Sequence, residues 1–154
     1  MNILGISGAI GWDGNEHVAT DEKVQKKDYW VHGSGATLIM DGELKNSMCE
    51  ERFSRIKYDG NYPVLAIEKI LDHNKLTKYD IDLVVYVGNC CIMSFELKRL
   101  GYIGQKLQEY FPNCKVEFLS HHTAHSTATF YTSGFEESLD LLKIFLRSYD
   151  NFQE

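Results

Sequence analysis

The sequence predicts a single mixed α/β domain, in which a three-strand antiparallel meander is followed by helices that alternate with parallel strands. Several short apolar runs end in glycine or asparagine, which is typical of buried strands. Asp41-Gly42 joins two of these runs, and this dipeptide is a strong signal for a tight hairpin. The later apolar runs alternate with segments of helical spacing, as parallel strands joined by crossover helices do.

Five segments have the composition of strands. The first ends at Gly8, the second and third flank the hairpin signal, and the fourth is an uninterrupted apolar run of the kind that is buried on both faces of a sheet. The predicted strands are residues 1–7, 34–40, 43–50, 82–87 and 115–119. Residues 8–31 are polar and lack periodicity, so we expect a long loop between the first and second strands.

Four segments have helical spacing. Pro63 suits the first position of the first helix, and Ser94 and Ser120 suit the N-caps of the next two. Gly134 is well placed to end the third helix. The predicted helices are residues 63–74, 94–111, 121–133 and 140–154. Up to the third helix, this order of strands and helices is that of the ribonuclease-H and actin-like ATPase fold.

Composition and charge narrow the function classes. A chain of 154 residues with 44% hydrophobic and 25% charged residues suits one globular domain. The net charge of −6 and the dispersed positive residues speak against nucleic acid or an anionic membrane as a partner. Because no apolar run could span a bilayer and the N-terminus lacks a signal sequence, we expect a cytoplasmic protein. The cysteines lack disulfide spacing, and we expect reduced, mostly buried thiols at Cys49, Cys90, Cys91 and Cys114.

His121 and His125 form the candidate metal site. They lie four residues apart directly after the last predicted strand, so a helix would place both imidazoles on one face within reach of a single ion. The alternative is a helix start with one solvated and one packed histidine, because two ligands do not close a coordination shell. His17 and His73 belong to no motif.

Several motifs along the chain occur together in one known family. They are residues 3–7, residues 32–36 with 41–43, residues 50–59 with Tyr62-Pro63, and residues 121–125 with 130–135. In this order they resemble the O-carbamoyltransferases of antibiotic tailoring and nodulation-factor synthesis, and they cover most of residues 1–139. The resemblance implies the actin-like N-terminal part of an enzyme whose second domain makes carbamoyl-adenylate from carbamoyl phosphate and ATP. The carbamoyl group then moves to the hydroxyl of a small-molecule acceptor.

The resemblance also assigns roles to individual histidines. His121 and His125 are implied to be metal ligands, usually of iron, completed by acidic residues further along in the family. His32 aligns with a histidine at the reaction centre, where a neutral imidazole can take the proton of the acceptor hydroxyl. Gly33 replaces the aspartate that follows this histidine in the family, and the loss of that carboxylate leaves a strand-edge histidine without a catalytic role as the alternative.

Arg52, Arg55 and Lys57 lie in a dense run of charges. Guanidinium and ammonium groups bind phosphate and carboxylate groups, so these residues are candidate ligands of a substrate anion. The alternative is a solvated face on which they pair with Glu50, Glu51 and Asp59.

Two departures from the family pattern shape the expected function. Residues 8–31 are inserted at the turn where actin-like proteins approach phosphate, and residues 140–154 replace a strand and an Asp/Gly-rich turn. We therefore expect a truncated or stand-alone N-terminal portion of a carbamoyltransferase, which is inactive unless another chain supplies the second domain. The alternative is a non-catalytic binding or regulatory module that self-associates or pairs with a full-length relative. A ribonuclease-H-type hydrolase is disfavoured because the strand ends offer no cluster of carboxylates.

Overall fold

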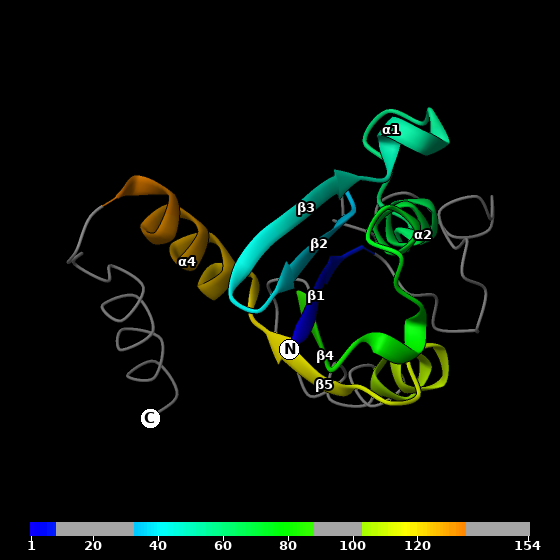
Figure 1. Cartoon of the computed structure of the whole chain (residues 1–154). Helices are drawn as coiled ribbons and strands as arrows, with labels where there is room; N and C mark the ends of the chain where they lie inside the picture. The colour runs from blue at the N-terminus through cyan, green and yellow to red at the C-terminus, as the bar shows by residue number, and fades with distance from the viewer. Residues whose placement is uncertain (9–32, 88–102, 135–154) are drawn as a thin grey trace, which may run out of the picture.

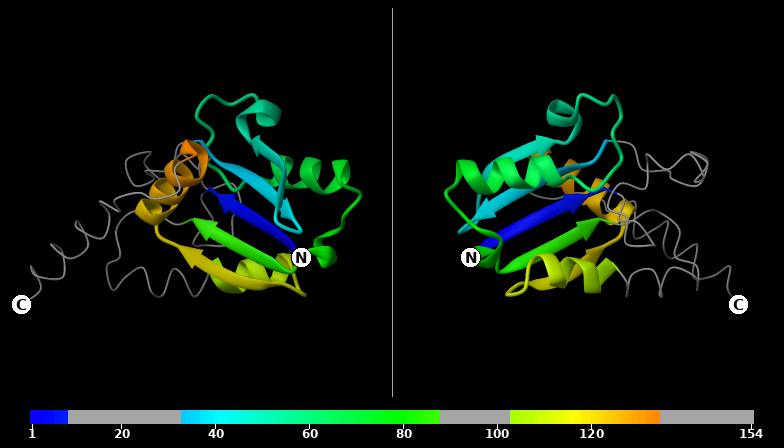
Figure 2. Two further views of the ribbon diagram at one scale, coloured as in Figure 1. Left: turned by 60° about the vertical axis from the view of Figure 1, so that its left-hand side comes forward. Right: turned by 90° about the vertical axis from the view of Figure 1, so that its right-hand side faces the viewer.

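The computed structural model describes residues 1–8, 33–87 and 103–134. These residues form a five-stranded mixed sheet with helices on either side (Figures 1 and 2). The strands are β1 (Asn2–Ser7), β2 (Gly35–Met40), β3 (Glu43–Cys49), β4 (Leu83–Val87) and β5 (Lys115–Leu119). The helical elements are α1 (Glu51–Ser54), α2 (Val64–His73), the 3-10 helix η2 (Lys78–Asp80) and α4 (His121–Ser133), and residues 103–110 are also helical.

The strand order is β3-β2-β1-β4-β5, so the first strand of the chain lies in the middle of the sheet. β1 pairs antiparallel with β2 and parallel with β4. β2 and β3 form the predicted hairpin around Asp41-Gly42, and β4 pairs parallel with β5. The predicted meander followed by parallel strands is therefore confirmed.

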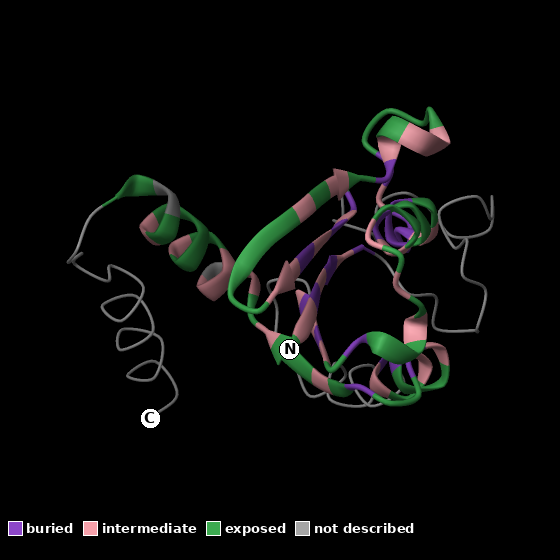
Figure 3. Cartoon of the chain, viewed as in Figure 1, coloured by how far each residue is buried: buried purple, intermediate pink, exposed green. Residues whose placement is uncertain are grey.

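The hydrophobic core lies between the sheet and one layer of helices. α2 and the helix of residues 103–110 lie on the same face of the sheet (Figures 1 and 2). The side of α2 that faces the sheet is buried (Figure 3). Fully buried side chains of this layer include Leu4, Leu38, Ile67, Ile70 and Phe111. Because each such side chain contributes about 1.5–3 kcal/mol on burial, this layer is the main source of stability among the described residues.

α4 lies on the opposite face of the sheet and extends away from the end of β5 (Figures 1 and 2). No described side chain of α4 is buried, and Tyr131 is 77% exposed. The sheet side chains that alternate with the core residues, such as Val85 and Leu119, are half-buried. Within the described residues, this face is covered less completely than the α2 face (Figure 3).

Four local features differ from the sequence predictions. Pro63 stands at the N-cap of α2, one residue before the helix, and the short helix α1 was not predicted. β4 alternates between buried and half-buried residues, because one of its faces points away from the core. Cys49 is exposed, whereas Cys114 is buried as expected and burial raises the pKa of its thiol.

Some predictions fall outside the described residues. They concern the loop 8–31 from residue 9 onward, His32, the thiols of Cys90 and Cys91, the first part of the helix 94–111 and the tail 140–154. None of the helices in the described part of the chain is both long and apolar enough to cross a membrane.

Candidate metal centre and cationic lobe

The candidate metal centre lies at the start of α4, directly after β5. Ser120 has an extended backbone, and its Oγ accepts a hydrogen bond from the Thr123 N–H at 3.2 Å. Gly134, with φ 74°, ends the helix in the left-handed conformation that glycine adopts readily. These caps fix both ends of α4, as the sequence predicted, and so fix where His121 emerges after the strand.

His121 and His125 lie side by side on one face of α4. Their Nε2 atoms are 2.9 Å apart, the ring centroids are 4.4 Å apart, and the ring planes cross at 81°. His121 is half-buried and His125 is exposed. A spacing of one helical turn therefore brings the two imidazoles together.

The two Nε2 atoms are at hydrogen-bond distance, with one ring nitrogen as donor and the other as acceptor. The same separation also fits two ligands of one ion. Imidazole nitrogens bind divalent transition metals at about 2.0–2.1 Å, and two such nitrogens at a right angle are about 2.9 Å apart. Two nitrogens do not complete a coordination shell. Among the described residues, no group of three or more His, Cys, Asp or Glu side chains is placed to hold a metal ion. Metal binding at this pair would require ligands from outside the described residues.

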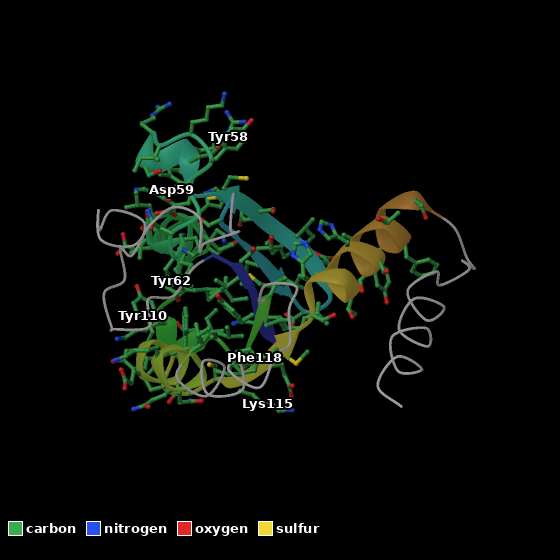
Figure 4. The ribbon with its side chains drawn as sticks, turned by 180° about the vertical axis from the view of Figure 1, so that it is seen from behind. Tyr58, Asp59, Tyr62, Tyr110, Lys115 and Phe118 are labelled. Atoms are coloured by element: carbon green, nitrogen blue, oxygen red, sulfur yellow. The ribbon has the colours of Figure 1, made fainter. Side chains whose placement is uncertain are left out.

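A cationic protrusion, which we call the α1 lobe (residues 51–58), extends from the end of β3 (Figure 1). Arg52, Arg55 and Lys57 are exposed, and none of them forms an ion pair with another described residue. The Lys57 Nζ lies 5.0 Å from the ring centroid of Tyr58, which is 66% exposed. The α1 lobe thus presents its positive charges and an aromatic ring to solvent (Figure 4).

Glu50, just before the lobe, holds the start of α2. Its side chain is 4% exposed, and its carboxylate accepts the N–H groups of Leu65 at 3.1 Å and Ala66 at 2.8 Å. The N-cap residue of α2 is Pro63, whose side chain has no acceptor, so Glu50 takes over the role of an N-cap side chain. Sequence reasoning missed this role. The available signal was that the two residues just before the helix, Tyr62 and Pro63, are not Ser, Thr, Asp or Asn.

The other two acidic residues of this segment also bond to backbone amides. Glu51 Oε2 accepts the Tyr58 N–H at 3.1 Å, and Asp59 Oδ1 accepts the Asn61 N–H at 3.0 Å. Neither carboxylate forms an ion pair with a cation of the described residues. The three cations therefore lie on a solvated face, as the alternative interpretation expected, but the structure shows no ion pair between them and Glu50, Glu51 or Asp59.

β1 ends in a crowded turn at Gly8. A Cβ at this position would lie 2.5 Å from the Asn61 carbonyl oxygen and 2.9 Å from the Ser34 Cβ. The Tyr86 hydroxyl donates a hydrogen bond to the Gly8 carbonyl from the neighbouring strand β4. Glycine is required here by close approach of the backbone, and the turn fixes the point at which the chain leaves the sheet toward residue 9.

His32, the candidate base, lies outside the described residues, and its role stays a prediction. The next residue, Gly33, is exposed and has φ 80°. Glycine adopts this left-handed conformation more readily than the aspartate that stands here in the resembling family.

Comparison with known proteins supports part of the resemblance. No family model matches the sequence. The chain is 26% identical to nodulation protein NolNO of Sinorhizobium fredii over an alignment of 159 residues, which covers 92% of this chain and 22% of NolNO. It is 23% identical to the uncharacterized protein sll1178 of Synechocystis over 71% of this chain and 23% of that protein. The chain therefore spans about a fifth of the length of these relatives.

A solved structure decides the fold class. YeaZ from Pseudomonas aeruginosa superimposes with a TM-score of 0.50 and 10% sequence identity, over 88% of this chain and 50% of YeaZ. The fold is that of the actin-like ATPases. At this level of identity the likeness to YeaZ shows the fold alone. The actin-like architecture predicted from the order of strands and helices is thus confirmed.

Proposed function

We propose that residues 1–154 are the actin-like portion of a carbamoyltransferase, an enzyme that transfers a carbamoyl group to a substrate hydroxyl. The similarity to NolNO over 92% of the chain carries this proposal, because the motifs of the carbamoyltransferases of nodulation-factor synthesis recur here in family order. The actin-like fold and the paired imidazoles of α4 support it.

In this proposal each candidate residue has one role. His121 and His125 bind a divalent metal, iron by resemblance, together with acidic ligands from outside the described residues. The bound metal would supply a Lewis acid near the reacting group. Arg52, Arg55 and Lys57 bind the phosphate or carboxylate group of a substrate through charge-assisted hydrogen bonds. His32 takes the proton of the acceptor hydroxyl.

The reaction is divided between this portion and the rest of the enzyme. In the resembling family a second domain makes carbamoyl-adenylate from carbamoyl phosphate and ATP, and residues 1–154 correspond to about a fifth of the relatives. Purified residues 1–154 are therefore expected to form neither carbamoyl-adenylate nor a carbamoylated acceptor from these substrates. Chromatographic detection of carbamoyl-adenylate or a carbamoylated acceptor with this polypeptide alone would refute the proposed division of the reaction between the two parts of the enzyme.

The metal role is tested by elemental analysis. The protein is loaded with ferrous iron without oxygen, desalted and compared with the double variant His121→Ala, His125→Ala. We expect the double variant to retain much less iron than the wild type. His73→Ala, which removes an exposed histidine of α2, is the matched control and should retain the wild-type amount. Equal iron in the wild type and the double variant would contradict the proposal.

A second candidate function is a binding or regulatory module that self-associates or pairs with a full-length relative. α4 favours it, because a helix of 13 residues normally gains its stability by packing, yet none of its described side chains is buried and Tyr131 is exposed. Sedimentation of the purified protein, alone and mixed with NolNO, distinguishes the candidates. A monomer that leaves the sedimentation of NolNO unchanged would count against this second function.

A further inference from the structure

One side chain-to-backbone hydrogen bond spans the α1 lobe from its first residue to its last, whereas the Ile56 N–H to Ser54 Oγ and Arg55 N–H to Glu51 carbonyl bonds join residues closer together. Glu51, at the start of the lobe, accepts the N–H of Tyr58, at its end, at 3.1 Å. The three cations of the proposed anion site lie between these two residues in the sequence. The hydrogen bond from Tyr58 to Glu51 therefore joins the two ends of the segment that contains Arg52, Arg55 and Lys57.

The backbone of the lobe needs such a constraint. Arg55 has φ 62° and Tyr58 has φ 58°, so two residues with side chains are in the left-handed conformation. Each costs about 1–3 kcal/mol and persists only where the surrounding structure fixes it. Tyr58 is both a left-handed residue and the donor to Glu51, so the hydrogen bond acts at one of the two strained positions.

Glu51 could act on an anion site in two opposite ways. As a negative charge near the cations, it would weaken the binding of an anion, and its removal would strengthen binding. As a hydrogen-bond acceptor that holds the lobe, it would strengthen binding by keeping the cations in place. Glu51 forms no ion pair with a described lysine or arginine, and its Oε2 bonds to an amide instead.

We infer that Glu51 is a positioning residue of the anion site: its carboxylate holds residues 51–58 in the conformation that presents Arg52, Arg55 and Lys57 to one phosphate-type anion. This inference rests on the proposed function of these cations. The negative charge of Glu51 alone would weaken the binding of an anion, whereas its role as hydrogen-bond acceptor is inferred to strengthen that binding.

Two variants of Glu51 separate the acceptor from the charge. Glu51→Gln keeps an oxygen acceptor for the Tyr58 N–H and loses the charge, whereas Glu51→Ala loses both. Binding of inorganic pyrophosphate is measured by NMR titration at constant ionic strength. We expect Glu51→Gln to bind at least as tightly as the wild type and Glu51→Ala to bind about fivefold more weakly. The Tyr58 amide should exchange faster in Glu51→Ala only.

Three controls make the outcome decisive. Glu68→Ala removes an exposed carboxylate from α2 outside the lobe and should leave the affinity unchanged or slightly higher. Arg55→Ala tests the site itself and should weaken binding about tenfold. Far-UV circular dichroism checks that each variant is folded.

The possible failures are distinguishable. If the wild type binds pyrophosphate and Arg55→Ala does not, but Glu51→Ala binds as tightly as Glu51→Gln, the positioning role is overturned and the anion site stands. If the wild type itself does not bind pyrophosphate, or Arg55→Ala binds normally, the anion site fails and the role of Glu51 fails with it.

Discussion

Replacing Glu50 by alanine tests whether the end of β3 holds the start of α2. The variant removes the acceptor of the Leu65 and Ala66 N–H groups. Ala66 is fully buried, so its N–H loses a hydrogen bond that water cannot replace, at a cost of about 1–3 kcal/mol. Leu65 is 38% exposed, and water can solvate its N–H. With about 0.3–1 kcal/mol for the lost charge at the helix N-terminus, the free energy of unfolding should fall by about 2–3 kcal/mol.

Urea unfolding followed by far-UV circular dichroism measures this loss. For a slope of about 1–3 kcal/mol per molar urea, the midpoint of Glu50→Ala should fall by about 1 M without a change of slope. Glu50→Gln keeps an uncharged acceptor and should unfold between the wild type and the alanine variant. Glu68→Ala removes an exposed carboxylate from the same helix and should stay within about 0.5 kcal/mol of the wild type. Equal midpoints for Glu50→Ala and Glu68→Ala would show that the reasoning is wrong.

Three further predictions concern other parts of the structure. Gly8→Ala should destabilise the protein by about 2 kcal/mol or more in thermal unfolding, because its Cβ would lie 2.5 Å from a carbonyl oxygen. Gly104→Ala is the control and should be neutral or stabilising, because its Cβ would lie 3.5 Å from the nearest atom. A Gly104→Ala variant less stable than Gly8→Ala would contradict the packing argument. Ser120→Ala should cost about 1 kcal/mol and speed amide exchange in the first turn of α4; unchanged exchange would exclude a capping role. A hydrogen bond to Asp41 raises the pKa of the exposed Met1 ammonium, and the ammonium lowers the pKa of Asp41. The stabilisation from the raised ammonium pKa is lost as the pH rises through the pKa of the ammonium in the folded protein. The stabilisation from the lowered carboxyl pKa is lost as the pH falls through the pKa of Asp41 in the folded protein. The pair therefore stabilises the folded protein at pH values between these two pKa values. NMR titration should give a higher Asp41 pKa after N-terminal acetylation, and an unchanged value would exclude the pair.

The strands could be predicted because turn-forming or capping residues mark where they end in the sequence. β5 was predicted at residues 115–119, between Pro112-Asn113 and the cap Ser120, and the structure has the same bounds. The hairpin followed from Asp41-Gly42, and both residues adopt the positive φ that a tight turn of this kind requires. The strand ends and the hairpin depend on residues that are adjacent in the sequence, and such residues can be read from one sequence alone.

The role of Glu50 could not be predicted in the same way. It lies in a dense run of charges, where a carboxylate is normally solvated, yet it is buried against amides 15 and 16 residues further along the chain. Only the packing of β3 against α2 brings these groups together. The left-handed conformations of Arg55 and Tyr58 were equally hidden, because neither residue is a glycine or an asparagine.

The candidate metal centre was predictable only in part. Helical spacing sufficed to bring His121 and His125 together, because both residues lie on one element. Further ligands of a metal bound there would have to come from other elements, and the positions of such residues depend on the arrangement of the whole fold. The sequence therefore predicts a pair of ligands but not a closed coordination shell.

The central position of β1 has a consequence for how the protein forms during synthesis. Of the five described strands, β1 leaves the ribosome first, but its edge toward β4 lacks that partner until β4, which ends at Val87, has also emerged. Until then the nascent chain carries an apolar strand with an open edge, a known starting point for aggregation. We therefore expect fragments that stop before residue 83 to be poorly soluble, and slow translation of this stretch to increase the demand for chaperones.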